Sequence, residues 1–155
     1  DHIFGRIGDD IPVYISNQVD HPDKIYRYMQ RWSRTPGLET LDVTRIDVIA
    51  FHPELDYFGR YNIFYDGLVL TWQNEAQPGF ARWWRKTKAE LTFYHEVGHH
   101  HFQHRESGQV EEQEREADEY KRLMFRNAHP ILIPVLAVVY FPVLFTSKLL
   151  RRSFR

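Results

Sequence analysis

Two histidines spaced four residues apart constrain this chain more than any other feature of its sequence. They begin and end the pentapeptide HEVGH, His95 to His99, and five of the nine histidines fall within ten residues here. On an α-helix, residues four apart lie on one face about 6 Å from each other, so both imidazoles can reach one metal ion. The surrounding pattern predicts a helix over residues 80–104. Two imidazoles fill only half of a four-coordinate site, so a second element must pack against this helix and supply another ligand.

The glutamate of the pentapeptide is placed to act as a general base. Glu96 lies one step around the helix from His95, so it can reach a water bound to the ion more easily than the ion itself. Zinc lowers the pKa of such a water, and a neighbouring carboxylate can accept its proton and pass it to a leaving amine. The pattern therefore indicates a zinc-dependent endopeptidase. The H-E-x-x-H spacing also occurs in unrelated helices, but Gly98, which narrows the helix beside the ligands, and the acidic segment that follows favour a metal site.

The third ligand is expected on a second helix, which the apolar periodicity predicts over residues 109–127. This helix offers six carboxylates, namely Glu111, Glu112, Glu114, Glu116, Asp118 and Glu119. Glu114 and Glu116 flank its apolar stripe from opposite sides, so helical position does not choose between them. An acidic run of this kind is also typical of a solvated helix face.

Two stretches of the sequence resemble a family of zinc peptidases. Residues 92–100 (TFYHEVGHH) and 114–120 (EREADEY) resemble the gluzincin-like peptidases of the ImmA/IrrE type, and more weakly the HtpX-like and CAAX-prenyl endopeptidases. The resemblance covers residues 90–124 and implies a zincin-like fold with bound Zn²⁺.

The resemblance also implies a role for each residue that matches. His95, His99 and Glu114 would be the zinc ligands, Glu96 the general base, and Asp118 a carboxylate that orients one of the ligating imidazoles.

The chain departs from these families in two respects. The interval between the two stretches is shorter, and Lys121 stands where a small residue is usual. These departures leave open a second interpretation, in which the chain is a catalytically silent accessory subunit or interaction module of a membrane complex.

The overall pattern predicts the α+β class. We expect a metallopeptidase domain over residues 1–128, in which a small, mainly antiparallel sheet packs on the metal helix and the ligand helix. The other predicted elements are a strand at 11–15, a helix that begins at 20–23, a strand at 43–51, and a hairpin of 61–65 with 68–72 around a two-residue Asp66-Gly67 link. Pro12 should confine the first strand to an edge of the sheet.

The C-terminal segment has the composition of a membrane anchor. Residues 131–147 contain no charge and would span about 25 Å as a helix, close to the thickness of a bilayer. The following basic residues favour the cytoplasmic side of a membrane. We therefore expect residues 129–155 to form an apolar tail that spans or anchors in a membrane. The alternative is a buried helix or hairpin of a soluble cytoplasmic regulator of the ImmA/IrrE kind, which cleaves or binds a repressor.

Other features bear on partners. Residues 80–88 (FARWWRKTK) mix aromatics with cations, which suits a membrane interface or the start of a helix with tryptophan in the core. The expected substrate is a protein or peptide, which the hairpin could hold as an added strand unless it is purely structural. The net charge of −1 gives no reason to expect nucleic acid, and the absence of cysteine excludes disulfides.

Two further assignments stay open in the sequence. Tyr94 or Tyr120 could donate a hydrogen bond to the oxyanion of a substrate. His104 follows His100 by four residues and could share a second ion with it, although solvation or packing at the helix end is more typical.

Overall fold

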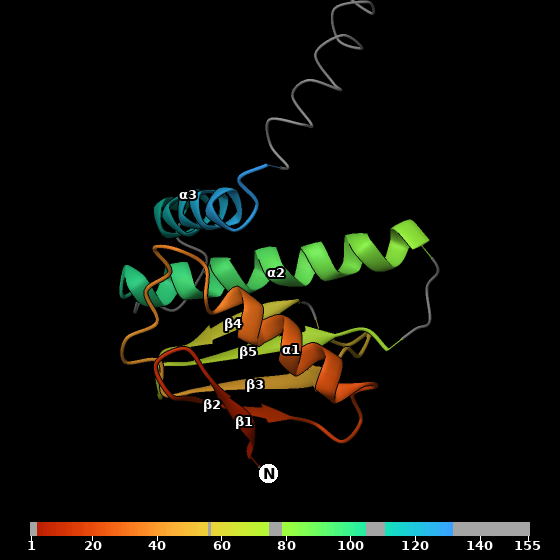
Figure 1. Ribbon diagram of the computed structural model, residues 1–155. Helices are drawn as coiled ribbons and strands as arrows, with labels where there is room; N and C mark the ends of the chain where they lie inside the picture. Colours follow the sequence, from red (N-terminus) through yellow and green to blue (C-terminus); the bar gives the residue numbers. More distant parts are fainter. Residues whose placement is uncertain (1–2, 56, 75–78, 105–110, 132–155) are drawn as a thin grey trace, which may run out of the picture.

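The computed structural model describes residues 3–55, 57–74, 79–104 and 111–131. These residues have the predicted α+β class and form a five-stranded mixed sheet and three helices (Figure 1). In chain order the elements are β1 (Ile3–Ile7), β2 (Ile11–Ile15), α1 (Pro22–Trp32), β3 (Arg45–Ala50), β4 (Gly59–Asn62), β5 (Gly67–Trp72), α2 (Gly79–His101) and α3 (Glu111–Ala128).

The sheet has the order β1-β2-β3-β5-β4, and the prediction that it is mainly antiparallel is wrong. The central strands β2, β3 and β5 run parallel, and only the outer pairs β1–β2 and β4–β5 are antiparallel. The connection from β2 to β3 contains α1, which allows the parallel pairing that a tight turn cannot. After β3 the chain forms the outer strand β4 first and then turns back. β5 therefore lies between β3 and β4, parallel to β3 and antiparallel to β4.

The predicted position of β2 at an edge is also wrong. β2 lies between β3 and the unpredicted strand β1. Its pairing with β3 begins only at Val13, opposite Ile46. Pro12 therefore precedes the ladder on that side, where its missing N–H does no harm.

The predicted hairpin is present, but its turn differs from the expected one. Asn62 pairs with Gly67, so four residues, 63–66, form the turn instead of a two-residue link. Asp66 adopts the left-handed conformation with φ of 47°, and the Tyr61 hydroxyl donates a hydrogen bond to its carboxylate. The hairpin makes β4 the edge strand that lies against α2.

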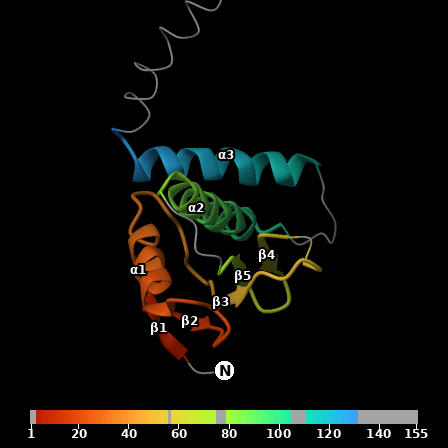
Figure 2. The ribbon, with the colours of Figure 1, turned by 90° about the vertical axis from the view of Figure 1, so that its right-hand side faces the viewer.

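The helices form two layers over one face of the sheet. α1 and α2 lie directly on this face, and α3 crosses α2 on the side away from the strands (Figures 1 and 2). The largest buried side chains come from all three parts: Trp32 and Met29 from α1, Phe93 from α2, and Ile46 and Leu68 from the sheet. The rings of Trp32 and Phe93 have centroids 5.9 Å apart, which joins α1 to α2.

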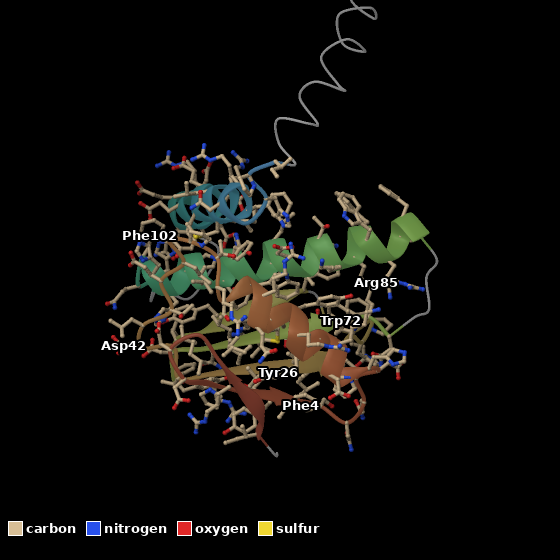
Figure 3. All side chains as sticks on the ribbon, in the orientation of Figure 1. Phe4, Tyr26, Asp42, Trp72, Arg85 and Phe102 are labelled. Atoms are coloured by element: carbon tan, nitrogen blue, oxygen red, sulfur yellow. The ribbon has the colours of Figure 1, made fainter. Side chains whose placement is uncertain are left out.

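The long helix α2 extends from one end of the molecule to the other. Arg85 lies near its beginning, beside the end of β5, whereas Phe102 follows its last residue at the opposite end of the molecule (Figure 3).

Both predicted helices of the site are present, with bounds that differ from the predicted ones by at most three residues. The helix predicted over residues 80–104 is α2, which ends at His101, and the helix predicted over residues 109–127 is α3, which ends at Ala128.

No helix in the part of the chain that the structure describes is both long enough and apolar enough to cross a membrane. The predicted tail lies outside the described residues, apart from its first positions up to Ile131.

Candidate metal centre

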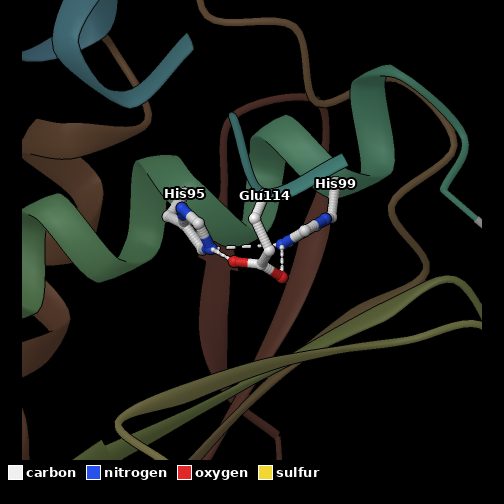
Figure 4. Close-up of side chains that lie close together, drawn as sticks. All are labelled: His95, His99 and Glu114. Atoms are coloured by element: carbon white, nitrogen blue, oxygen red, sulfur yellow. Dashed lines mark hydrogen bonds and ion pairs between the residues drawn. The ribbon is translucent and has the colours of Figure 1, made fainter. Parts of the chain in front are cut away.

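Three side chains that the sequence singles out converge between α2 and α3 (Figure 4). His95 and His99 project from one face of α2, and their Nε2 atoms are 3.1 Å apart. Glu114, in the first turn of α3, faces both imidazoles. Its Oε2 lies 3.3 Å from His95 Nε2 and its Oε1 lies 3.4 Å from His99 Nε2. Among the described residues, this is the one group of three or more histidine and carboxylate side chains whose atoms could hold a metal ion together. We call His95, His99 and Glu114 the ligand group.

A close contact between the two helices brings Glu114 to this position. A Cβ atom at Gly98 would lie 3.1 Å from the Cα of Ala117, so any other residue would push the two backbones apart by about a few tenths of an ångström. α3 buries Ala117, Tyr120 and Met124 along one stripe, which fixes the face that it turns toward α2. Glu114 lies one turn before Ala117, on the side of the imidazoles.

The separations within this group suit a small divalent ion such as zinc. Ligand atoms at about 2.0–2.1 Å from a tetrahedral zinc ion are about 3.3 Å from each other. The two imidazole nitrogens are 3.1 Å apart, and each lies 3.3 Å or 3.4 Å from a different oxygen of the Glu114 carboxylate. The two imidazoles also have the protonation state that metal binding needs, because burial lowers the pKa of His95, and lowers that of His99 to about 4.

Glu96 is buried next to this group, with a relative exposure of 6%. It packs against β4, where a Cβ atom at Gly59 would lie 2.8 Å from Glu96 Oε1. Burial raises the pKa of Glu96 to about 8, and a hydrogen bond from the backbone of Tyr61 opposes this rise. Glu96 therefore lies between the ligand group and the edge strand, as a carboxyl that can hold a proton near neutral pH.

Asp118 lies beside one of the two imidazoles, that of His95, and the resemblance predicts a contact of this kind without saying which imidazole is involved. Its Oδ1 lies 3.0 Å from His95 Nδ1, an ion-pair distance, although the two groups are not aligned as a hydrogen bond. The same Oδ1 accepts a hydrogen bond from the ammonium group of Lys121. The unusual lysine therefore competes with His95 for Asp118, and its charge lowers the pKa of His95.

The other carboxylates of α3 lie outside the ligand group. Glu116, the second candidate for third ligand, turns toward His104, and its Oε2 lies 2.9 Å from His104 Nε2. Glu111, Glu112 and Glu119 are exposed. The geometry thus separates Glu114 from Glu116, which helical position alone did not.

The structure does not bring the suggested oxyanion donors to the ligand group. The Tyr94 hydroxyl is bonded to Thr35 and Glu90 in the core, and the Tyr120 hydroxyl accepts the backbone N–H of Glu39.

The suggested pair of His100 and His104 does not form either. His100 Nε2 bonds the backbone oxygen of Leu41, whereas the buried His104 contacts His99. The sequence missed this contact because His104 lies beyond the end of α2, where helical spacing no longer predicts neighbours.

Comparison with models of known protein families, with curated proteins and with solved structures finds no match. The geometry of the site and the chemistry of its residues therefore carry the functional argument.

Proposed function

We propose that this protein is a zinc-dependent endopeptidase. The observation that carries the proposal is the convergence of the His95 and His99 imidazoles on the Glu114 carboxylate, with the buried carboxyl of Glu96 beside them. An acidic helix face that is merely solvated would not place one of its carboxylates against two neutral imidazoles of a neighbouring helix.

The chain's own groups divide the chemistry between binding and proton transfer. A zinc ion, when bound, would polarise the scissile carbonyl and make an attacking water more acidic. Glu96 would take one proton from this water as its oxygen adds to the carbonyl carbon. It would then give the proton to the amide nitrogen as the C–N bond breaks, leaving a carboxyl and an amine product. The raised pKa of Glu96 suits a group that must hold a proton between these two steps, and the charge of a bound cation would lower this pKa so that Glu96 begins as the carboxylate.

The surroundings of Glu96 favour a polypeptide substrate. Among the strands that the structure describes, β4 is the last of the sheet and pairs with β5, so its outer edge is a candidate to bind an extended peptide as an added strand. Gly59 and Tyr61 of this strand contact Glu96, which would place the backbone of an added strand next to the ligand group.

Membrane association through residues 131–147 is a second part of the proposal. The start of α2 supports it, because Phe80, Trp83 and Trp84 are 74%, 45% and 54% exposed. Exposed tryptophan and phenylalanine suit the depth of lipid headgroups.

The neighbouring cations contribute less to this argument. Arg85 donates a hydrogen bond to the backbone oxygen of Gln73, and Lys86 and Lys88 lie over the rings of Tyr28 and Phe58. Aromatic exposure therefore carries the membrane part of the proposal, together with the sequence of the tail.

The substitution Glu96→Gln tests the enzymatic part. We expect the wild-type protein and the variant to bind about one zinc ion per chain, since Glu96 is not a ligand in this arrangement. Cleavage of denatured casein should fall by about 10²–10⁴-fold in the variant, because general base catalysis is lost. Zinc content is measured by elemental analysis and cleavage by release of labelled fragments.

Glu119→Gln is the matched control, because it changes an exposed carboxylate of α3 and should leave cleavage unchanged. Equal cleavage by the wild type and Glu96→Gln would refute the role of Glu96. Zinc binding without any cleavage by the wild type would support a silent accessory subunit instead.

A further inference from the structure

The chain leaves α2 through a turn that folds His104 back onto the helix. Gln103 adopts the left-handed conformation with φ of 54°. Its N–H bonds the oxygen of His100 at 3.0 Å, and the N–H of His104 bonds the oxygen of His99 at 3.0 Å. This pair of bonds is the Schellman motif, which commonly brings the side chains at the positions of His99 and His104 into contact.

In this protein the two side chains in contact are imidazoles. His99 Nδ1 lies 2.9 Å from His104 Nδ1, and the two rings meet edge to face with centroids 5.1 Å apart. His104 Nε2 lies 2.9 Å from Glu116 Oε2. A continuous path of hydrogen bonds therefore runs from His99 through His104 to a carboxylate of α3.

The direction of each hydrogen bond follows from the chemistry of the ligand group. Nε2 of His99 must present a lone pair to a metal ion, so the proton of the neutral ring is on Nδ1. His99 Nδ1 then donates to Nδ1 of His104, whose own proton is on Nε2 and is donated to Glu116. One set of proton positions satisfies all three residues.

The two imidazoles of the ligand group are thus supported in different ways. His95 contacts Asp118 directly, whereas His99 reaches Glu116 through an additional histidine. His104 is buried, with 7% of its side chain exposed, so it holds a fixed position behind His99.

We propose that His104 and Glu116 position His99 for metal binding, with His104 as the residue that orients its ring and fixes its tautomer. This inference rests on the proposed zinc site. Residues that support a ligating histidine in this way contribute about 10–100-fold to metal affinity.

The test compares zinc affinities of full-length variants by competition with a chelator. His104→Phe keeps a ring of similar size but cannot accept a hydrogen bond, and should weaken zinc binding by about 10–100-fold. His104→Asn places a carboxamide oxygen near the former Nδ1 and should recover part of the affinity. His101→Phe is the matched control, since His101 pairs with Glu39 and lies outside the ligand group.

Two further measurements separate positioning from a general structural role. The Co²⁺-loaded His104→Phe protein should show an altered visible spectrum, because the ligand geometry changes. Combining His104→Phe with Glu116→Ala should weaken zinc binding no more than His104→Phe alone, since Glu116 acts through His104. Glu116→Ala alone removes the acceptor with a partly exposed side chain, so it provides the same test if His104→Phe does not fold.

The outcomes distinguish this inference from the proposed function. If the wild type binds no zinc, the metal site itself is refuted. If the wild type and Glu116→Ala bind zinc with equal affinity and His104→Phe is within about twofold of both, only the positioning role is refuted. Equal losses in His104→Phe and His101→Phe would also refute it.

Discussion

Three carboxylates of α3, each two residues from the next, contact four different imidazole nitrogens. Glu114 faces the Nε2 atoms of both ligand imidazoles, Glu116 contacts His104, and Asp118 contacts Nδ1 of His95. Position within the fold, and not residue type, therefore decides which carboxylate can bind a metal. The same holds for Glu96, whose burial gives it a pKa unlike that of an exposed glutamate.

The raised pKa of Glu96 predicts how the stability of the metal-free protein depends on pH. In the folded state its pKa is about 8, compared with an ordinary value of 4.5 for glutamate. Between these values the folded state retains a proton that the unfolded state releases, so this group lowers stability as the pH rises. Glu96→Gln removes the effect, and its stability relative to wild type should increase from about pH 5 to about pH 9.

Urea unfolding in the presence of a chelator measures this difference. His99, whose pKa is lowered to about 4, is shared by both proteins and contributes equally to each. A stability difference that does not change with pH would contradict the assigned pKa of Glu96.

The sequence predicted those site residues whose spacing is set by a single helix. His95, Glu96 and His99 follow from the period of α2, whereas Glu114 needed the family resemblance because its position depends on how two helices cross. His104 could not be predicted, because a left-handed residue outside the helix brings it to His99.

At the scale of secondary-structure elements, the site depends on the contact between α2 and α3. Gly98 and Ala117 bring the two helices together beside the ligands. The candidate metal ligands come from both helices, so a change in helix separation moves Glu114 relative to the imidazoles.

Gly98→Val tests this dependence. Its side chain would meet the backbone of α3, and overpacking of this kind costs about 1–3 kcal/mol of stability. Zinc affinity should fall as well, because Glu114 moves away from His95 and His99. Chemical unfolding of the metal-free protein and chelator competition measure the two effects.

Glu119→Val is the control, because it introduces the same side chain at an exposed position of α3. Similar losses in both variants would indicate an effect of helix propensity and would contradict the proposed steric contact.

The elements themselves were largely predictable, but the direction in which strands pair was not. Apolar periodicity gave both helices of the site, and alternation with β-branched residues gave β2, β3 and the hairpin. Pairing direction depends on where the connection through α1 places β3, and this information is not local. β1 was missed because Gly5 and Arg6 interrupt its apolar pattern.

At the scale of the whole molecule, the described residues contain a continuous core. Its buried apolar side chains extend along the sequence from Ile7 to Met124 and come from the sheet and all three helices. His129, just after α3, also belongs to this unit, since its Nε2 lies 2.9 Å from the buried carboxylate of Glu90.

This core predicts that a chain ending at Pro130 folds without the apolar tail. The truncated protein should unfold cooperatively in urea and bind zinc as tightly as the full chain, because all residues of the ligand group remain. It should no longer float with lipid vesicles, whereas the full chain should. An unfolded truncation product would instead favour a tail that forms part of a soluble core.

The pairing of His99 on α2 with Glu114 on α3 has a consequence for a chain that contains no cysteine. An ion shared by these residues would close a loop across the segment between them. Closing a loop of about 15 residues with a disulfide restricts the unfolded chain by about 3 kcal/mol, and a metal bridge acts on the same entropy. A bound zinc ion would then act as a reversible cross-link that stabilises the folded chain.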